Sequence, residues 1–142
     1  MVRHARPEVQ AFIDFFEQLQ PADLPRLGQF YAAQAYFKDP FNEVEGIPAI
    51  TAIFAHMFKA VQNPRFVVRA AVAEEAQCFL TWDFCFISRG KPMTVHGSSH
   101  LRFDAQGRVA WHRDYWDVAE ELYEKLPVLG SLMRWLKRQA SR

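Results

Sequence analysis

The spacing of apolar residues changes partway along the chain. Up to about residue 61, apolar side chains recur every three to four positions, which is typical of amphipathic helices. From Phe66 onward the chain consists of runs rich in β-branched and aromatic residues, separated by short polar connections. Helices followed by a meander of strands predict an α+β domain, with the helices packed on one face of a bent antiparallel sheet.

Three helices are predicted in the first part of the chain. The first lies between Pro7 and Pro21, the second begins at the capping residue Asp23, and the third occupies residues 47–61. A short strand at residues 35–39 and a loop separate the second helix from the third. The apolar side of the second helix is predicted to be Leu24, Leu27, Phe30 and Tyr31.

Four longer strands are predicted in the rest of the chain, at residues 65–73, 77–88, 92–103 and 108–117. Side chains alternate between the two faces of a strand, so residue parity sorts them. In the last strand this places His112 and Asp114 on one face, with Ala110 and Trp116. In the strand 77–88 both faces are largely apolar, so helices are expected to cover the concave face and a second subunit the convex one.

Gly97, followed by Ser98 and Ser99, is weak strand sequence. One interpretation is a β-bulge that bends the sheet. The other is space cleared for a ligand, and the two are compatible.

Composition agrees with one folded domain over residues 1–142, with a core at about 8–117 and a helical tail at 118–142. Half of the 142 residues are hydrophobic and 15% are aromatic, including 13 Phe, which is enough for a core and a lined cavity. The formal net charge is +1 and no basic stripe with interleaved aromatic residues occurs before the last residues, which argues against nucleic-acid binding.

The compartment is predicted from what the sequence contains. Cys78 and Cys85 fall on opposite faces of one predicted strand, so they are expected to be free thiols of a reducing compartment. No signal peptide and no apolar stretch of about 18 residues is recognisable. A cytoplasmic location is the expectation. No Cys and His spacing indicates zinc and no glycine-rich loop indicates a dinucleotide, so neither metal nor cofactor is expected.

The chain resembles the nuclear transport factor 2 fold superfamily over residues 8 to about 117. The order of elements, "DPFNEVEGIPAI" before the third helix and "HLRFDAQGRV" between the last two strands carry the resemblance. That superfamily includes ketosteroid isomerases, SnoaL-like polyketide cyclases and limonene epoxide hydrolases. The resemblance implies a cone-shaped domain with a pocket between helices and concave sheet, usually in a homodimer.

The resemblance also implies candidate catalytic residues. Asp39, followed by Pro40, matches the position of the general base in ketosteroid isomerases, whereas the oxyanion donors of that family align with Phe15 and Ser99. Asp114 matches the last-strand acid/base of SnoaL-like cyclases. The Asp, Arg, Asp group of limonene epoxide hydrolases has no match, because no Arg is expected to face inward.

These observations predict a cofactor-free domain that binds a small apolar molecule, with Asp39, His112 and Asp114 as its catalytic groups. The alternatives are that Asp39 starts a turn, that Asp114 and His112 are structural, and that the domain is a non-catalytic binding or interaction module. The tail is expected to cap the pocket or pack on a partner subunit, with membrane contact as the rival. The predicted ligand-binding residues are Phe15, Tyr31, Phe54, Trp82, Phe84, Phe86, Ser99 and Trp116.

Overall fold

A computed structural model describes residues 2–122, 135–136 and 138–140 of the chain. Within these residues the helices are α1 (Pro7–Glu17), the 3-10 helix η1 (Pro21–Gln29), α2 (Ile47–Ala60) and the short α3 (Val118–Glu121). The strands are β1 (Tyr31–Lys38), β2 (Glu43–Glu45), β3 (Gln62–Glu74), β4 (Gln77–Ser88), β5 (Lys91–Phe103) and β6 (Val109–Tyr115).

The strands described form one sheet in the order β2-β1-β6-β5-β4-β3. All pairs are antiparallel except β1 and β6, which run parallel. This parallel pair arises because α2 and the β3–β5 meander separate β1 from β6 in sequence and allow the chain to return beside β1. The α+β class and the bent sheet expected from the sequence are thus confirmed, with one parallel pair in the sheet.

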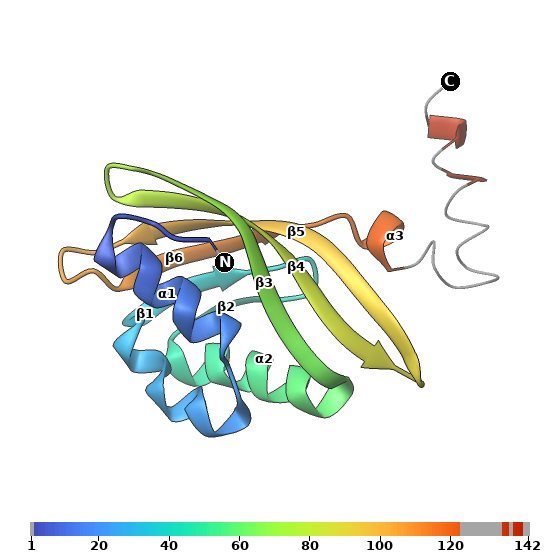
Figure 1. Cartoon of the computed structure of the whole chain (residues 1–142), viewed down its shortest axis with the longest axis horizontal. Helices are drawn as coiled ribbons and strands as arrows, with labels where there is room; N and C mark the ends of the chain where they lie inside the picture. Colours follow the sequence, from blue (N-terminus) through green and yellow to red (C-terminus); the bar gives the residue numbers. More distant parts are fainter. Residues whose placement is uncertain (1, 123–134, 137, 141–142) are drawn as a thin grey trace.

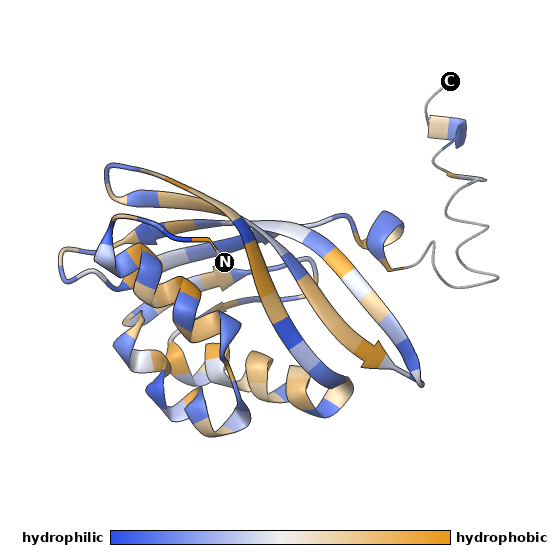
Figure 2. Cartoon of the chain, viewed as in Figure 1, coloured by the Kyte–Doolittle hydropathy of each residue, from blue (hydrophilic) through white to orange (hydrophobic). Residues whose placement is uncertain are grey.

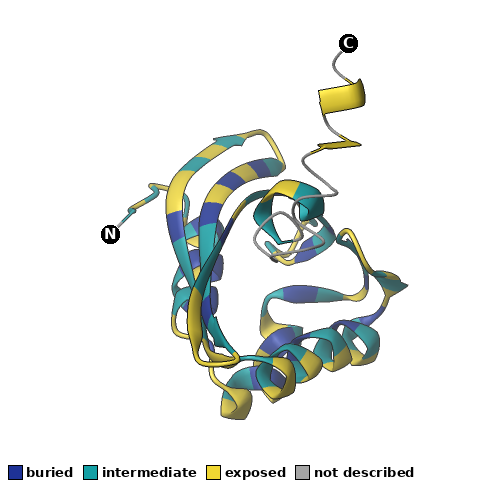
Figure 3. Ribbon diagram, turned by 90° about the vertical axis from the view of Figure 1, so that its right-hand side faces the viewer, coloured by how far each residue is buried: buried dark blue, intermediate teal, exposed yellow. Residues whose placement is uncertain are grey.

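The helices α1 and α2 lie on the same side of the sheet, and the long strands β3, β4 and β5 are strongly twisted (Figure 1). Polar and apolar residues alternate along these long strands (Figure 2). Burial follows that alternation, and the helices turn their buried residues inward (Figure 3). The concave face therefore forms the core together with the two helices.

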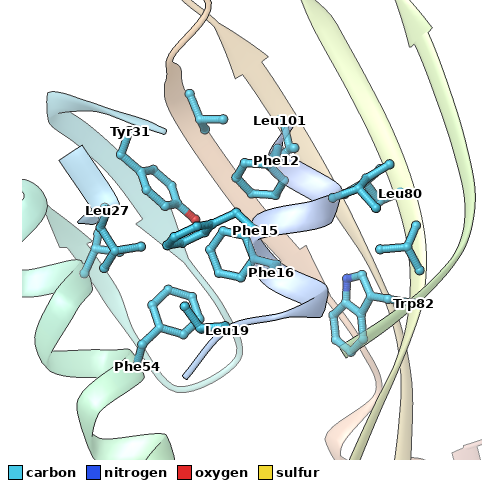
Figure 4. Close-up of a cluster of buried hydrophobic side chains, with 14 of the residues drawn as sticks. Phe12, Phe15, Phe16, Leu19, Leu27, Tyr31, Phe54, Leu80, Trp82 and Leu101 are labelled. Carbon is cyan, nitrogen blue, oxygen red and sulfur yellow. The ribbon is translucent and has the colours of Figure 1, made fainter. Parts of the chain in front are cut away.

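Helix α1 supplies much of that core. Ile13 and Val9 are almost completely buried, and Phe12 and Phe16 pack ring to ring at 4.6 Å. Figure 4 shows Phe12 and Phe16 between Tyr31 on one side and Leu80 and Trp82 on the other. These four buried residues of α1 are spaced as on one side of an amphipathic helix, and that side packs on the sheet.

The second predicted helix differs from expectation. The segment forms the 3-10 helix η1, with Pro25 inside it, because a proline lacks the N–H that an α-helix needs and crowds the preceding turn. The helix ends before Tyr31, so Tyr31 opens β1 and is not a helical residue. The predicted strand at 35–39 is therefore longer and begins earlier, and the expected loop after it contains β2.

Two details of the sheet also differ from simple alternation. Pairing between β4 and β5 runs without a register shift through Trp82 and Gly97, so the bulge interpretation of Gly97 is wrong. The shift lies instead between Arg102 and Phe103, opposite β6. There Ala110 is the extra residue, and Val109 returns to the core, fully buried.

The predicted helical tail at 118–142 lies mostly outside the described residues. Its first turn, α3, is capped by Asp117, whose carboxylate accepts a hydrogen bond from the N–H of Glu120 at 3.1 Å. In the described part of the chain, no helix is both long and apolar enough to cross a membrane.

Candidate functional site

A chain of hydrogen bonds joins five side chains across the concave face. The Tyr31 hydroxyl lies 2.7 Å from His112 Nδ1, and His112 Nε2 lies 2.6 Å from Asp114 Oδ1. The same carboxylate oxygen is 2.5 Å from Ser99 Oγ, which lies 2.8 Å from Trp82 Nε1. The structure therefore unites Tyr31, Trp82, Ser99, His112 and Asp114, which were predicted to be site residues, in one network.

Sheet register places these residues together. His112 and Asp114 are two positions apart on β6, so their side chains share a face. Ser99 of β5 pairs directly with Asp114. Tyr31 lies at the start of β1, the parallel neighbour of β6, and its ring stacks on His112 with an interplanar angle of 6°.

The directions of these hydrogen bonds follow from what each group can donate. The indole N–H of Trp82 only donates, so Ser99 accepts it and gives its own hydroxyl proton to Asp114. His112 Nε2 faces a carboxylate and donates to it. We assign the Tyr31 hydroxyl as the donor to His112 Nδ1, because its proton has no other acceptor among the described residues; this assignment corresponds to a neutral imidazole protonated on Nε2.

Burial keeps Tyr31 a donor. Burial raises the pKa of Tyr31 well above its usual value near 10, and the negative charge of Asp114 raises it further. The phenol is therefore protonated throughout the physiological range. The Tyr31 hydroxyl is no exception to the rest of the described residues, in which every buried side-chain nitrogen or oxygen has a hydrogen-bond partner.

Asp114 is the point at which this network meets open space. Its Oδ1 accepts from both His112 and Ser99, while Oδ2 has no hydrogen-bond partner among the described residues. The carboxylate lines a recess between α1, α2 and the sheet with a cavity volume of about 40 Å³. We call this space the aromatic recess; it is lined by Phe12, Ile13, Phe16, Phe54, Phe66, Val68, Leu80, Trp82, Ser99, His112 and Asp114.

A wider cleft of about 560 Å³ lies on the outer side of Asp114. Trp116 and Asp39 line it together with residues from the ends of β1 and β6. Asp114 is common to the recess and the cleft, and its side chain is 18% exposed. A ligand can therefore approach this carboxylate from the cleft.

Asp39 does not join the network. Its Oδ1 accepts from the backbone N–H groups of Phe41 and Asn42 at 2.8 and 2.7 Å, and from the Asn42 amide at 3.1 Å. A carboxylate that bonds the backbone two and three residues on is the standard stabiliser of an Asx turn. The geometry thus favours the turn interpretation, with Asp39 at the cleft and outside the recess.

The other predicted ligand-binding residues divide into two groups. Phe54 lines the recess, as Trp82 and Ser99 do. Phe84 and Phe86 pack against each other at 5.0 Å, and Phe15 stacks on Phe30 at 4.1 Å. The predicted residues that do not line the recess are Phe15, Phe84, Phe86, Tyr31 and Trp116.

Sequence reasoning missed the contribution of α1 to the recess. Phe12, Ile13 and Phe16 line it, and the helical stripe that contains them was visible in the sequence. The sequence pattern was used only to predict the helix. Phe66, Val68 and Leu80 were missed as well, and strand parity alone gives no signal that separates cavity-lining from core residues.

No metal centre is visible in the described part of the chain, where no three His, Cys, Asp or Glu residues lie close enough to hold an ion. His96 and His100 are on the outer face of β5, as parity predicts. His96 Nδ1 lies 2.5 Å from Asp83, and His100 stacks on Phe79 at 4.3 Å.

Helices packed on one face of a strongly curved sheet, with a recess between them, are the architecture of ketosteroid isomerase-like α+β domains. The chain belongs to the SnoaL-like domain family, whose family model matches residues 9–112. No curated protein matches the chain.

Solved structures show the same fold at low sequence identity. A hypothetical protein from Catenulispora acidiphila with a ketosteroid isomerase-like fold, in complex with trimethylamine, has a TM-score of 0.71 at 17% identity, over 84% of this chain and 92% of that one. A nuclear transport factor 2-like protein of unknown function from Exiguobacterium has a TM-score of 0.67 at 20% identity, over 78% and 98% of the two chains. A limonene epoxide hydrolase-like enzyme from M. tuberculosis has a TM-score of 0.65 at 16% identity, over 80% and 83%.

Proposed function

We propose that the protein binds a small, mostly apolar molecule beside Asp114 and that this carboxylate accepts a proton from it, in cofactor-free chemistry of the isomerase or cyclase type. The observation that carries the proposal is the state of Asp114 at this mostly apolar recess: two donors bond one of its oxygens, and the other has no partner among the described residues. A positioned carboxylate with a free oxygen is the requirement for a general base.

His112 and Ser99 position this base in the proposed mechanism. Both ring nitrogens of His112 are occupied, one by Tyr31 and one by Asp114, so His112 orients the carboxylate and has no free ring nitrogen to offer the ligand. Ser99 donates to the same oxygen from the neighbouring strand β5. Oδ2 is thereby left as the atom that faces the ligand.

The size of the recess limits what enters without rearrangement. At roughly 10–15 Å³ for each water in this measure, a cavity of about 40 Å³ holds about three waters. Pockets for drug-sized ligands are roughly 300–1,000 Å³. A polycyclic substrate would therefore have to occupy the outer cleft or displace aromatic side chains, whereas a ligand of a few atoms fits as the structure stands.

The proposed base can be tested before the substrate is known, by hydrogen exchange at acidic carbon atoms. We expect the protein to accelerate deuterium incorporation at the α carbons of cyclopentanone and 2-tetralone in D₂O, followed by proton NMR. Asp114→Asn is expected to reduce the enzymatic rate by about 100-fold or more, because it removes the base and keeps the side-chain shape. Asp39→Asn is the matched control and should retain the rate.

Either of two outcomes would contradict the catalytic proposal. One is exchange no faster than in buffer for both ketones. The other is an Asp114→Asn variant, shown to be folded by circular dichroism, that exchanges at the rate of the parent protein.

A non-catalytic binding module is the second candidate, and one observation favours it. Developing negative charge on an enolate oxygen needs hydrogen-bond donors. The side-chain donors of the residues lining the recess, on Trp82, Ser99 and His112, are all committed to partners within the network. This candidate predicts ligand binding without exchange. The trimethylamine complex of the Catenulispora neighbour supports small-molecule binding by this fold and is silent on turnover.

We further propose that the outer sheet face binds a second copy of the chain. Val72, Phe79, His100 and Arg113 pair in register across β3 to β6, and Val72 and Phe79 are 65% and 49% exposed. Burial and then the nearby Arg102 lower the pKa of His100, which leaves it neutral within this stripe. Exposed apolar stripes of this kind mark interaction surfaces. Light scattering should give a dimer mass for the parent protein and a monomer mass for Phe79→Glu; a monomeric parent would refute the proposal.

A further inference from the structure

The charge of the aromatic recess is one-sided. Asp114 is the one formally charged residue among those described as lining it, and no Lys or Arg contributes to the lining. We assign His112 the neutral tautomer, in which Nδ1 accepts from Tyr31 while Nε2 donates to the carboxylate. The recess therefore presents a net negative charge to anything that enters.

The hydrogen-bonding capacity of the recess is equally one-sided. Trp82, Ser99 and His112 each use their side-chain proton within the network. Among the described residues that line the recess, the polar side-chain atom left without a hydrogen-bond partner is an acceptor, Asp114 Oδ2. A ligand that itself needs a donor, such as a carboxylate or phosphate, finds none there, whereas a cation is complementary to it.

Aromatic rings make up much of the wall. Phe16 lies 5.3 Å from Phe54 and 6.2 Å from Phe66, and Phe66 lies 6.1 Å from Trp82, measured between ring centroids. Figure 4 shows Phe12 and Phe16 from one helix and Phe54 from another in one cluster with Trp82 of the sheet. Rings of this kind attract a cation through their electron-rich faces, and most strongly where water is excluded.

We propose that the aromatic recess binds a small alkylammonium group, such as a methylated amine, with Asp114 as its counter-ion. The proposal combines the negative charge of the recess, its lack of free hydrogen-bond donors, its aromatic lining and its small volume. Room for about three waters corresponds to a cationic head of a few heavy atoms. The apolar rings replace the weak hydration shell of an alkylated nitrogen, and the carboxylate offsets its charge. The inference rests on the binding part of the proposed function and is independent of turnover.

The test compares a cation with a neutral molecule of nearly the same size. Tetramethylammonium chloride and tert-butanol are each titrated into the protein at constant ionic strength, with sodium chloride as the background salt. Binding is followed by calorimetry and by the proton NMR shift of the ligand methyl groups, which nearby aromatic rings move upfield. Saturable binding of tetramethylammonium, at least about tenfold tighter than that of tert-butanol, is expected.

Three variants locate the site. Asp114→Asn is expected to weaken the cation by about tenfold or more and to leave tert-butanol unchanged. Phe66→Leu should weaken the cation by about two- to fivefold, because it keeps apolar volume and removes a ring face. Asp39 lies outside the recess, so the Asp39→Asn variant is the control and should bind tetramethylammonium like the parent protein. If one of the two recess variants misfolds, the other still tests the site against this control.

The outcomes separate the two proposals. Equal affinity for tetramethylammonium and tert-butanol, or cation binding that Asp39→Asn weakens and Phe66→Leu does not, would overturn the ammonium assignment. Ketone exchange that depends on Asp114, together with no binding of tetramethylammonium, would overturn only this inference. Cation binding without exchange would support it and count against catalysis.

Discussion

Gly97 of β5 and Trp82 of β4 face each other across paired strands, and the indole of Trp82 occupies the space that a side chain at position 97 would need. A Cβ atom on Gly97 would lie 2.4 Å from Cη2 of Trp82, closer than such contacts permit. The same indole places its Nε1 at 2.8 Å from the hydroxyl oxygen of Ser99, two residues further along β5. The glycine thus leaves room for the indole whose N–H bonds Ser99, and Ser99 in turn donates to Asp114.

Gly97→Ala is predicted to destabilise the protein by about 1–3 kcal/mol, because the new methyl group overpacks against the indole. It should also shift or broaden the indole N–H signal of Trp82 in proton NMR as the bond to Ser99 is strained. Urea unfolding measures the first effect. Gly28→Ala is the matched control, since its Cβ would meet Ile47 at an ordinary 3.5 Å. A Gly97→Ala variant as stable as Gly28→Ala would contradict the packing argument.

Ser99→Ala is predicted to cost about 1–3 kcal/mol in the free energy of unfolding, because it leaves the buried indole N–H of Trp82 without its partner. The loss should shrink when Trp82 is already Phe, and a double-mutant cycle with Trp82→Phe measures that coupling. Ser98→Ala is the control on the opposite face of the same strand. Additive effects of the two substitutions would show that the hydrogen bond contributes little.

The stability of the protein is predicted to fall between about pH 9 and pH 11. Burial raises the pKa of the Cys78 thiol from 9.0 to about 11. The unfolded chain therefore loses this proton first, so the stabilisation is full below pH 9 and is lost as pH rises through 11. The raised pKa of Tyr31 acts in the same direction above pH 10.

Urea unfolding at several pH values tests this alkaline loss. The slope of unfolding free energy against pH should be shallower in Cys78→Ala than in the parent protein. Cys85→Ala is the control, since Cys85 is only partly buried. Equal slopes in all three proteins would show that Cys78 does not cause the loss.

Local patterns in the sequence were sufficient for most of the fold. The stripe of α1 and the alternation along β4 and β5 each reflect short-range geometry, and the structure follows them. Pro25 inside the second helix was the local signal that this segment is not α-helical, and missing it placed Tyr31 on a helix. The parallel pairing of β1 with β6 joins segments far apart in sequence, which no local pattern specifies.

The candidate site was predictable only where one strand contains it. His112 and Asp114 are two residues apart, so parity alone put them together. The bonds from Tyr31 and Ser99 depend on which strands lie side by side, and the partner of Gly97 depends on register. The Asp39 prediction came from a resemblance in position, and a carboxylate before proline serves equally well as a turn stabiliser.

His112 is predicted to be neutral with its proton on Nε2, because its other nitrogen faces the buried Tyr31 hydroxyl, a donor with no other described partner. Two-dimensional nitrogen–proton NMR of the imidazole distinguishes the two tautomers directly. Tyr31→Phe removes the donor to Nδ1 and should destabilise the protein by about 1–3 kcal/mol, with mixing of the tautomers. Tyr36→Phe, at a half-buried tyrosine bonded to exposed Glu43, is the control and should leave the His112 signals unchanged. A proton found on Nδ1 in the parent protein would contradict this assignment, because Nδ1 would then donate and the Tyr31 hydroxyl would be its acceptor.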